Sequence, residues 1–89
     1  RRNAIAFYQG LLAGRKALME GFSINNVRQL VKEKVEQYPE MVLEYFEVAD
    51  SKNLTLLNDV NHSDQPILCI AGYAGEVRLI DNMFLHAGS

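Results

Sequence analysis

The hydrophobic pattern of this sequence changes period at Pro39, and this change limits the folds that are open to the chain. Before Pro39, apolar residues recur at steps of three and four, which is the spacing of one face of an α-helix. From Met41 on, apolar residues alternate with polar ones or form short runs, as they do in β-strands. Helices that come first and strands that follow predict an α+β domain, with two leading helices packed on a small, mainly antiparallel sheet of three strands.

The first helix is expected over residues 3–20, a segment without proline. Gly21 follows it and can adopt the left-handed conformation that ends many helices. Gly10 and Gly14 inside the helix each cost about 1 kcal/mol relative to alanine, and we expect them to allow close packing against another element. The apolar positions form one broad stripe of Ile5, Phe7, Tyr8, Leu11, Leu12, Leu18 and Met19.

The second helix is expected to begin after Ser23, because a serine hydroxyl in this position accepts a hydrogen bond from a first-turn N–H. Its apolar residues fall on one face, whereas its charged residues lie mostly on the other. Pro39 disfavours helical backbone at Tyr38 and therefore ends the helix. The apolar face consists of Ile24, Val27, Leu30, Val31, Val35 and Tyr38.

Three strands are expected after the helices. The first covers residues 41–50, with one irregular step in its alternation. The second covers residues 66–74 and is so apolar that we expect it to be buried on both faces. The third covers residues 77–85, and a tight turn joins it to the second.

The segment between the first two strands is expected to have little regular structure. Residues 51–57 are interpreted as a connector with a helical turn that Ser51 caps. Residues 58–65 are rich in Asn, Asp and Ser, a composition typical of loops. The sequence contains no internal repeat that would indicate a solenoid or an array.

Composition and charge exclude several classes of function. The 89 residues correspond to a single domain, and 48% hydrophobic and 22% charged residues are ordinary for a soluble globular protein. The net charge of -2 and the lack of a basic stripe in the sequence argue against nucleic-acid binding. Uninterrupted apolar runs, such as residues 4–8, are far shorter than the roughly 18–20 residues that span a bilayer. The single cysteine, Cys69, cannot form an internal disulfide and is typical of a reducing compartment.

The residue types that carry much of enzyme chemistry are sparse. Cys69 lies between Leu68 and Ile70, His62 lies in the polar loop, and His86 lies close to the end of the sequence. A catalytic cysteine needs a histidine within hydrogen-bond reach and a lowered thiol pKa. We therefore interpret Cys69 as a core thiol and both histidines as surface residues, and we predict no metal site.

The carboxylates are interpreted as solvated groups. Paired-carboxylate catalysis needs two acids that converge in a cleft, and the spacing of these residues predicts no such pair. Gly72 and Gly75 flank a hairpin and not a strand-to-helix turn, so no phosphate-binding loop is predicted. The acids concerned are Glu33, Glu36, Glu40, Glu44 and Glu47.

Arg78, Asp81 and Asn82 are the most unusual polar residues, because they lie in an otherwise apolar strand. We expect Arg78 to pair across the sheet, and Asp81 or Asn82 to bond exposed backbone at the strand end. A contact at a domain interface is the alternative. The residues by themselves therefore predict a small soluble α+β domain without a self-contained active site.

The run of residues 67–82, ILCIAGYAGEVRLIDN, consists of an apolar strand, a Gly-acidic turn and the closing sequence Val-Arg-Leu-Ile-Asp-Asn. This run resembles the closing hairpin of the pantothenate synthetases, or pantoate–β-alanine ligases. Residues 43–50, followed by Leu54, are similar to an earlier strand of that family. Residues 2–11 look like the helix after the family's interdomain hinge, so the resemblance covers nearly the whole chain.

The resemblance implies a two-domain enzyme, of which residues 1–89 are the C-terminal lid domain. The family's N-terminal nucleotide-binding domain carries a His-x-Gly-His signature and most contacts to ATP and pantoate. ATP, with Mg2+, and pantoate give pantoyl adenylate and pyrophosphate, and β-alanine then attacks the adenylate to give pantothenate and AMP. A lid suits this chemistry because the adenylate must be kept from water until the amine arrives.

The resemblance transfers no catalytic, cofactor-binding or metal-binding residue to this chain. The family's Ser-x-Arg-Asn motif lies at the hinge, but Arg1-Arg2-Asn3 runs directly into helix here, so we expect that motif upstream. The resemblance further implies a cytoplasmic enzyme that dimerises through its N-terminal domain, with an isolated fragment that is inactive, binds no cofactor and is monomeric.

Two other functions remain open from the sequence. The chain could be a stand-alone interaction module without catalytic activity, which binds a protein partner through its sheet or through the Ile5, Tyr8 and Leu12 stripe of the first helix. It could also hold a small molecule in a pocket between the helices and the sheet. Under the lid hypothesis, the same stripe would cover the core or meet the N-terminal domain.

Overall fold

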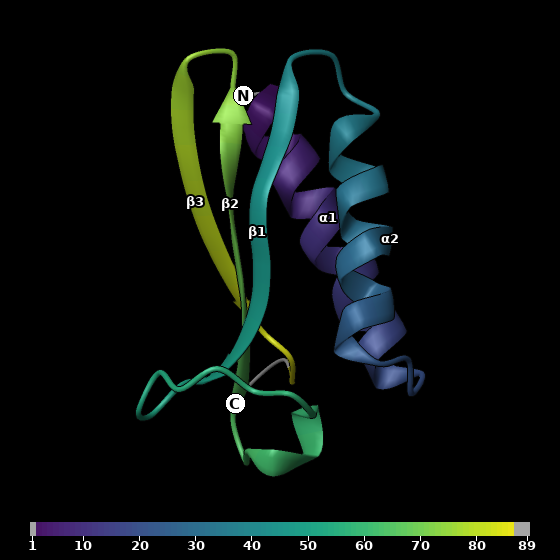
Figure 1. Ribbon diagram of the computed structural model, residues 1–89, viewed down its shortest axis with the longest axis vertical. Coiled ribbons are helices and arrows are strands. Elements are labelled where there is room, and N and C mark those ends of the chain that lie inside the picture. Colours follow the sequence, from purple (N-terminus) through teal and green to yellow (C-terminus); the bar gives the residue numbers. More distant parts are fainter. Residues whose placement is uncertain (1, 87–89) are drawn as a thin grey trace.

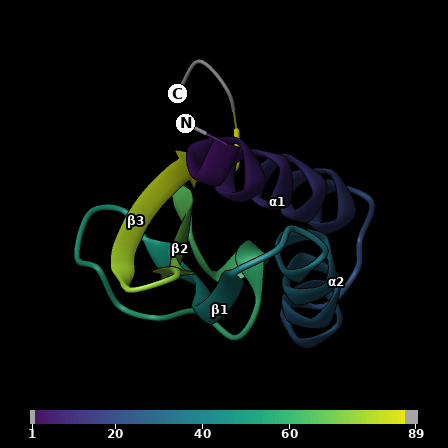
Figure 2. The ribbon, with the colours of Figure 1, turned by 90° about the horizontal axis from the view of Figure 1, so that it is seen from above.

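The computed structural model describes residues 2–86, and its elements follow the predicted order of two helices and three strands. The strands form one antiparallel sheet in the order β1-β2-β3, and both helices pack on the same face of it (Figures 1 and 2). The α+β prediction is therefore confirmed. The elements are α1 (Arg2–Met19), α2 (Ile24–Glu36), β1 (Met41–Asp50), a 3-10 turn (Val60–His62), β2 (Pro66–Ala74) and β3 (Val77–Phe84).

The junction between the helices forms as its sequence predicts. Gly21 has φ 98°, and the N–H groups of Gly21 and Phe22 donate to carbonyls in the last turn of α1. The Ser23 hydroxyl accepts from the N–H of Asn26 at 3.1 Å and so caps α2. This tight connection makes the two helices antiparallel neighbours on the sheet (Figure 1).

Gly10 and Gly14 let α1 approach its neighbours closely. A methyl group added at Gly10 would lie 2.9 Å from Cγ2 of Val35, and one at Gly14 would lie 3.0 Å from Cγ2 of Val31. Both distances are shorter than an ordinary carbon contact. The helix cost of the two glycines is thus offset by close packing of α1 on α2.

The apolar stripe of α1 is divided between the core and the surface. Phe7, Leu11 and Leu18 are buried, whereas Ile5 is 49% exposed and Tyr8 is 51% exposed. At 3.6 residues per turn, Tyr8 lies about 60° and Ile5 about 120° around the helix from the buried Leu11. α1 is the amphipathic helix that the stripe predicts, but the sheet and α2 cover only one side of that stripe.

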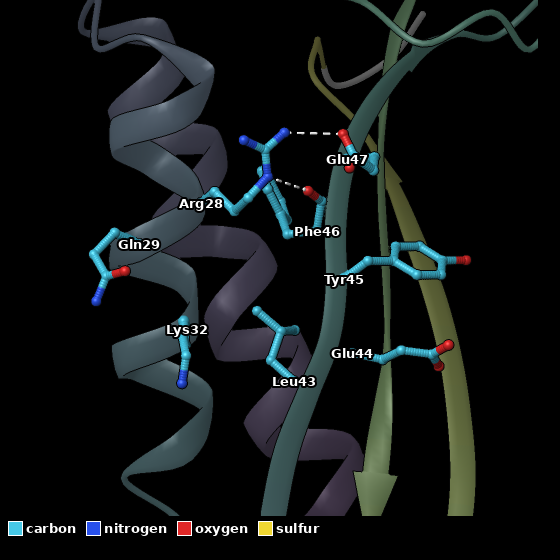
Figure 3. A pocket seen from close by; sticks show the side chains of 8 residues that line it. All are labelled: Arg28, Gln29, Lys32, Leu43, Glu44, Tyr45, Phe46 and Glu47. Atoms are coloured by element: carbon cyan, nitrogen blue, oxygen red, sulfur yellow. Dashed lines mark hydrogen bonds and ion pairs between the residues drawn. The ribbon is translucent and has the colours of Figure 1, made fainter.

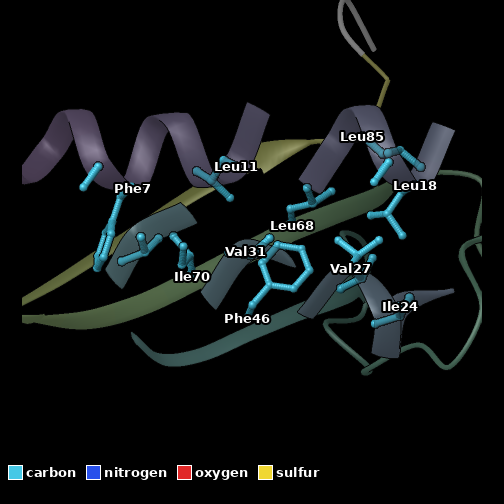
Figure 4. Close-up of a cluster of buried hydrophobic side chains, with 14 of the residues drawn as sticks. Phe7, Leu11, Leu18, Ile24, Val27, Val31, Phe46, Leu68, Ile70 and Leu85 are labelled. Atoms are coloured by element: carbon cyan, nitrogen blue, oxygen red, sulfur yellow. The ribbon is translucent and has the colours of Figure 1, made fainter. Parts of the chain in front are cut away.

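The core lies between the helices and the inner face of the sheet (Figure 4). Phe46 from β1 is fully buried beside Val31 of α2, and its ring lies close to Gly14 of α1. Leu85, just after β3, is buried near Leu18. The largest buried side chains shown are Phe7, Leu11, Val27, Val31, Phe46, Leu68 and Ile70.

The predicted irregular step in β1 is a register shift between Leu43 and Tyr45 in its pairing with β2. The tight turn between β2 and β3 is also confirmed, with Gly75 at φ 62°. The prediction that β2 is buried on both faces was wrong, because side chains on its second face are accessible to solvent. Leu68 and Ile70 are inaccessible, but Tyr73 is exposed and Ile67 is half-buried. Its apolar composition reflects its central position in the sheet and not a second covering layer.

The cap of the connector after β1 is Asp50 and not Ser51. The Asp50 carboxylate accepts from the backbone N–H groups of Lys52 and Asn53, at 2.8 and 3.2 Å. The Ser51 hydroxyl instead contacts the Gln65 side chain at 3.3 Å. Both residues have short polar side chains that can cap a turn, and only the fold decides which of them faces the free N–H groups.

Candidate functional site

A shallow groove of about 300 Å3 runs between α2 and β1 (Figure 3). Arg28 lies at one end of the groove, where its guanidinium contacts three groups. It donates from Nε to the carbonyl oxygen of Phe46 at 3.1 Å, from Nη2 to Glu47 at 2.9 Å, and from Nη1 to Asn25. The groove is lined by Arg28, Gln29, Lys32, Leu43, Glu44, Tyr45, Phe46 and Glu47.

Glu36 contacts the same edge of β1 further along α2. Its carboxylate accepts from Lys32 and from the backbone N–H of Leu43, the latter at 2.9 Å. The hydrogen bond from Lys32, followed by that from Leu43, lowers the pKa of Glu36 below its ordinary value of 4.5. Because β1 is an edge strand, Glu36 and Arg28 occupy backbone groups that would otherwise be open to another chain. The polar groups of this groove therefore fix α2 on the sheet.

The candidate acids do not converge within residues 2–86. Each of four glutamates contacts its own partner: Glu33 contacts Gln29, Glu36 contacts Lys32, Glu44 contacts Arg78, and Glu47 contacts Arg28. The remaining acid, Glu40, is exposed at the turn before β1 and has φ 71°. The described geometry contains no carboxylate pair of the kind that general acid–base catalysis needs.

Cys69 is half-buried and lies on the sheet face away from the helices, so the prediction of a core thiol was wrong. Burial, with a smaller effect of Glu47, raises the pKa of its thiol. A raised pKa leaves little reactive thiolate. The predicted surface positions of His62 and His86 are confirmed, since both are exposed. Across the described residues, no three His, Cys, Asp or Glu side chains are placed to hold a metal ion.

Arg78 pairs across the sheet as predicted. Its Nε lies 2.8 Å from the Glu44 carboxylate, and this contact links β3 to β1 over the central strand. The hydrogen bond to Glu44 raises the pKa of Arg78. The prediction that Asp81 or Asn82 bonds exposed backbone at the strand end was wrong. The Asp81 carboxylate accepts from the N–H of the adjacent Asn82, in the middle of β3.

Arg1, which was compared with the family's hinge motif, lies outside the described residues.

Sequence reasoning missed two features of the surface. Arg28 was read only as part of a polar helix face, although it joins α2 to β1. Leu54 and Leu56, in the connector, are 72% and 67% exposed. The only local signal of this exposed apolar site was the presence of two leucines in a polar segment.

In the part of the chain that the structure describes, no helix is long and apolar enough to cross a membrane.

Comparisons with known proteins identify the family. The family model for pantoate-beta-alanine ligase matches residues 1–84. The pantothenate synthetase of Bacteroides thetaiotaomicron is 34% identical over 93% of this chain and 29% of its own length. A bifunctional pantoate ligase/cytidylate kinase of Trichodesmium erythraeum is 36% identical over 96% of this chain and 16% of its own length.

A solved structure agrees with these matches. The pantothenate synthetase from Thermus thermophilus superimposes with a TM-score of 0.80 and 28% identity, over 97% of this chain and 30% of that one. The chain thus spans less than a third of the length of these relatives. By the match over residues 1–84 and by the identity to its relatives, the chain belongs to the pantoate–β-alanine ligase family.

Proposed function

We propose that this chain is the C-terminal lid domain of a pantothenate synthetase. The proposal rests on the difference in length between this chain and the enzymes that it matches. The relatives match nearly the whole of this chain, but the chain accounts for only 29–30% of two pantothenate synthetases. A compact two-layer domain of this size is the expected form of a separate domain in a longer enzyme.

The full-length enzyme would condense pantoate with β-alanine, using ATP and a pantoyl adenylate. Within the described residues, Glu36, Glu44 and Glu47 each pair with a different basic side chain, and no glycine-rich loop connects a strand to a helix. This donor set fits neither Mg2+ nor the ATP phosphates. We therefore assign both to the N-terminal nucleotide-binding domain.

The role of this chain in that reaction is to cover the site. An acyl adenylate reacts readily with water, so a rigid cover that excludes water protects it until the amine attacks. The packed core and the polar contacts that fix α2 on β1 supply rigidity. We also propose that the full-length enzyme is cytoplasmic and dimerises through its N-terminal domain, so that this chain alone is monomeric.

A chimeric enzyme tests the proposal. Residues 1–84 of this chain would replace the matched segment of the Bacteroides thetaiotaomicron synthetase, and formation of pantothenate and AMP would be measured. We expect the chimera to be active, and both the isolated chain and the synthetase without the segment to be inactive. A folded chimera with no activity above that of the shortened synthetase would contradict the proposal, as would pantothenate formation by the isolated chain.

A further inference from the structure

The face of the sheet that points away from the helices is unusually apolar. An antiparallel sheet with one solvated face normally places polar residues on that face. Here the strand register places Tyr45, Ala71 and Ile80 side by side across the three strands, with Ile67 beside Phe84. We call this surface the outer face, and it consists of Val42, Tyr45, Glu47, Ala49, Ile67, Cys69, Ala71, Tyr73, Arg78, Ile80, Asn82 and Phe84.

Several large side chains on the outer face are exposed, although Ala49 and Ala71 are buried. Ile80 is 63% exposed, and Phe84 and Tyr73 are exposed beside it. Figure 3 shows the Tyr45 side chain on the side of β1 opposite α2. Clustered exposed apolar residues with a polar rim mark interaction sites in soluble proteins. The rim is supplied here by the ion pair of Arg78 and Glu44.

The connector extends the outer face at the end of β1. Leu56 forms a bridge with Ala49, and the N–H of Asp50 donates to the carbonyl of Thr55 at 2.9 Å, so the connector folds back along the strand. The strand and the connector line an open apolar hollow of about 390 Å3. Its lining consists of Tyr45, Glu47, Ala49, Leu54, Leu56 and Cys69.

The backbone of the connector holds Leu54 in a strained conformation. Leu54 has φ 63°, in the left-handed region that costs a non-glycine residue about 1–3 kcal/mol. Its N–H donates to the carbonyl of Asp50 at 2.7 Å, and the Asp50 side chain fixes the two preceding N–H groups. The chain therefore uses several hydrogen bonds to hold a leucine in solvent, which stabilises the isolated chain little but suits a partner that covers it.

We propose that the outer face, with Leu54 and Leu56, is the surface on which the rest of a full-length pantothenate synthetase packs. This inference rests on the proposed function. The partner that covers the outer face is the remainder of the same enzyme, because most of the length of each relative lies outside the segment that this chain matches. The occupying surface presents apolar side chains to Ile80 and Tyr45, one of which enters the hollow beside Leu54.

The row of Ile5, Tyr8 and Leu12 on α1 is the competing surface. All its residues belong to a single helix, and Leu12 is already half-buried. Met19, which is 62% exposed, continues the row on the same helix. The outer face extends over three strands and the connector and contains a hollow. A large apolar partner surface is therefore better matched by the outer face, and the domain would contact the rest of the enzyme through its sheet.

Thiol labelling tests the assignment. Single-cysteine variants carry Cys69→Ser together with Leu54→Cys or Ile80→Cys on the proposed surface, Ile5→Cys on the competing one, or Lys34→Cys as a solvent control. Each is made in the isolated chain and in the chimera described above. Modification by iodoacetamide is followed at each position by peptide mass spectrometry. All four positions are exposed in this chain, so the substitutions leave the core intact.

We expect positions 54 and 80 to react at least about tenfold more slowly in the chimera than in the isolated chain, because a packed interface excludes the reagent. Position 34 reacts equally in both. Equal rates at 54 and 80, or slowing at position 5 alone, would overturn the inference. Concentration-dependent slowing at 54 and 80 in the isolated chain would also overturn it, because a second copy would then cover the face. The activity of the chimera tests the proposed function separately. If the chimera is active but positions 54 and 80 are not protected from labelling, only the assignment of the packing surface is refuted.

Discussion

The Nε of Arg28 donates to the carbonyl oxygen of Phe46 at 3.1 Å, and this bond joins the middle of α2 to the open edge of β1. The two residues are 18 positions apart in the sequence. Phe46 is the fully buried aromatic residue of β1, so its backbone is held from one side by Arg28 and from the other by β2. Helix, strand edge and core are thereby fixed together.

The stability of this junction can be measured with Arg28→Met, which keeps most of the apolar stem and removes the donors. We expect a loss of about 1–2 kcal/mol in the free energy of unfolding, which is less than a buried hydrogen bond to a charged group contributes because the Arg28 side chain is partly exposed. Urea unfolding followed by circular dichroism gives this value. Lys34→Met on the exposed side of α2 serves as the control, and equal stability of the two variants would refute the assigned role of Arg28.

Glu36 makes stability depend on pH. Its folded pKa lies below the ordinary value of 4.5, so the unfolded chain binds protons first as the pH falls. The contribution of Glu36 is therefore complete above pH 4.5 and is lost as the pH falls through the lowered pKa of the folded state. We expect the urea midpoint to fall over this range in the parent and to fall less steeply in Glu36→Gln. Identical pH profiles would show that Glu36 does not contribute.

Gly72 is expected to tolerate alanine less well than Gly10. A methyl group at Gly72 would overlap the carbonyl oxygen of Val42 and lie 2.9 Å from Cζ of Phe7, and the strand backbone cannot move aside. At Gly10 the near neighbour is the side chain of Val35, and alanine also favours the helix by about 1 kcal/mol. We expect Gly72→Ala to lose about 1–3 kcal/mol and Gly10→Ala to lose less. The reverse order in urea unfolding would contradict this packing.

Leu54 provides a test of stored strain. Asparagine adopts the left-handed conformation more readily than leucine, so Leu54→Asn should stabilise the isolated chain by up to about 1 kcal/mol. Leu56→Asn is the matched control, since Leu56 is similarly exposed and is not among the residues with positive φ. Thermal unfolding of both variants checks the difference. A Leu54→Asn variant no more stable than Leu56→Asn would show that the conformation at Leu54 carries no strain.

Local signals in the sequence predicted the elements well. The cap at Ser23, the helix end at Gly21 and the irregular step in β1 each depend on residues close together in the chain. The surfaces were harder to predict, because an apolar residue does not reveal whether another layer will cover it. Tyr73 was expected in a strand buried on both faces, yet it is exposed. For Tyr8, both a position over the core and a position at an interface were open, and it is exposed as well.

The polar contacts of the candidate site could not be predicted from local sequence patterns either. The bonds from Arg28 to Phe46 and from Arg78 to Glu44 join residues 18 and 34 positions apart, so they depend on the packing of whole elements. The pairing of Arg78 across the sheet was predicted, but its partner was not. The family, in contrast, was predicted correctly from the closing hairpin, and the match over residues 1–84 confirms it.

Sequencing of the coding DNA immediately upstream of Arg1 shows whether this chain is the lid domain of a longer synthetase. We expect an in-frame sequence with a Ser-x-Arg-Asn motif close by and a His-x-Gly-His motif further upstream, within a nucleotide-binding domain. A start codon directly before Arg1 would contradict the account, and the chain would then be a stand-alone member of the family that cannot serve as the lid of its own enzyme.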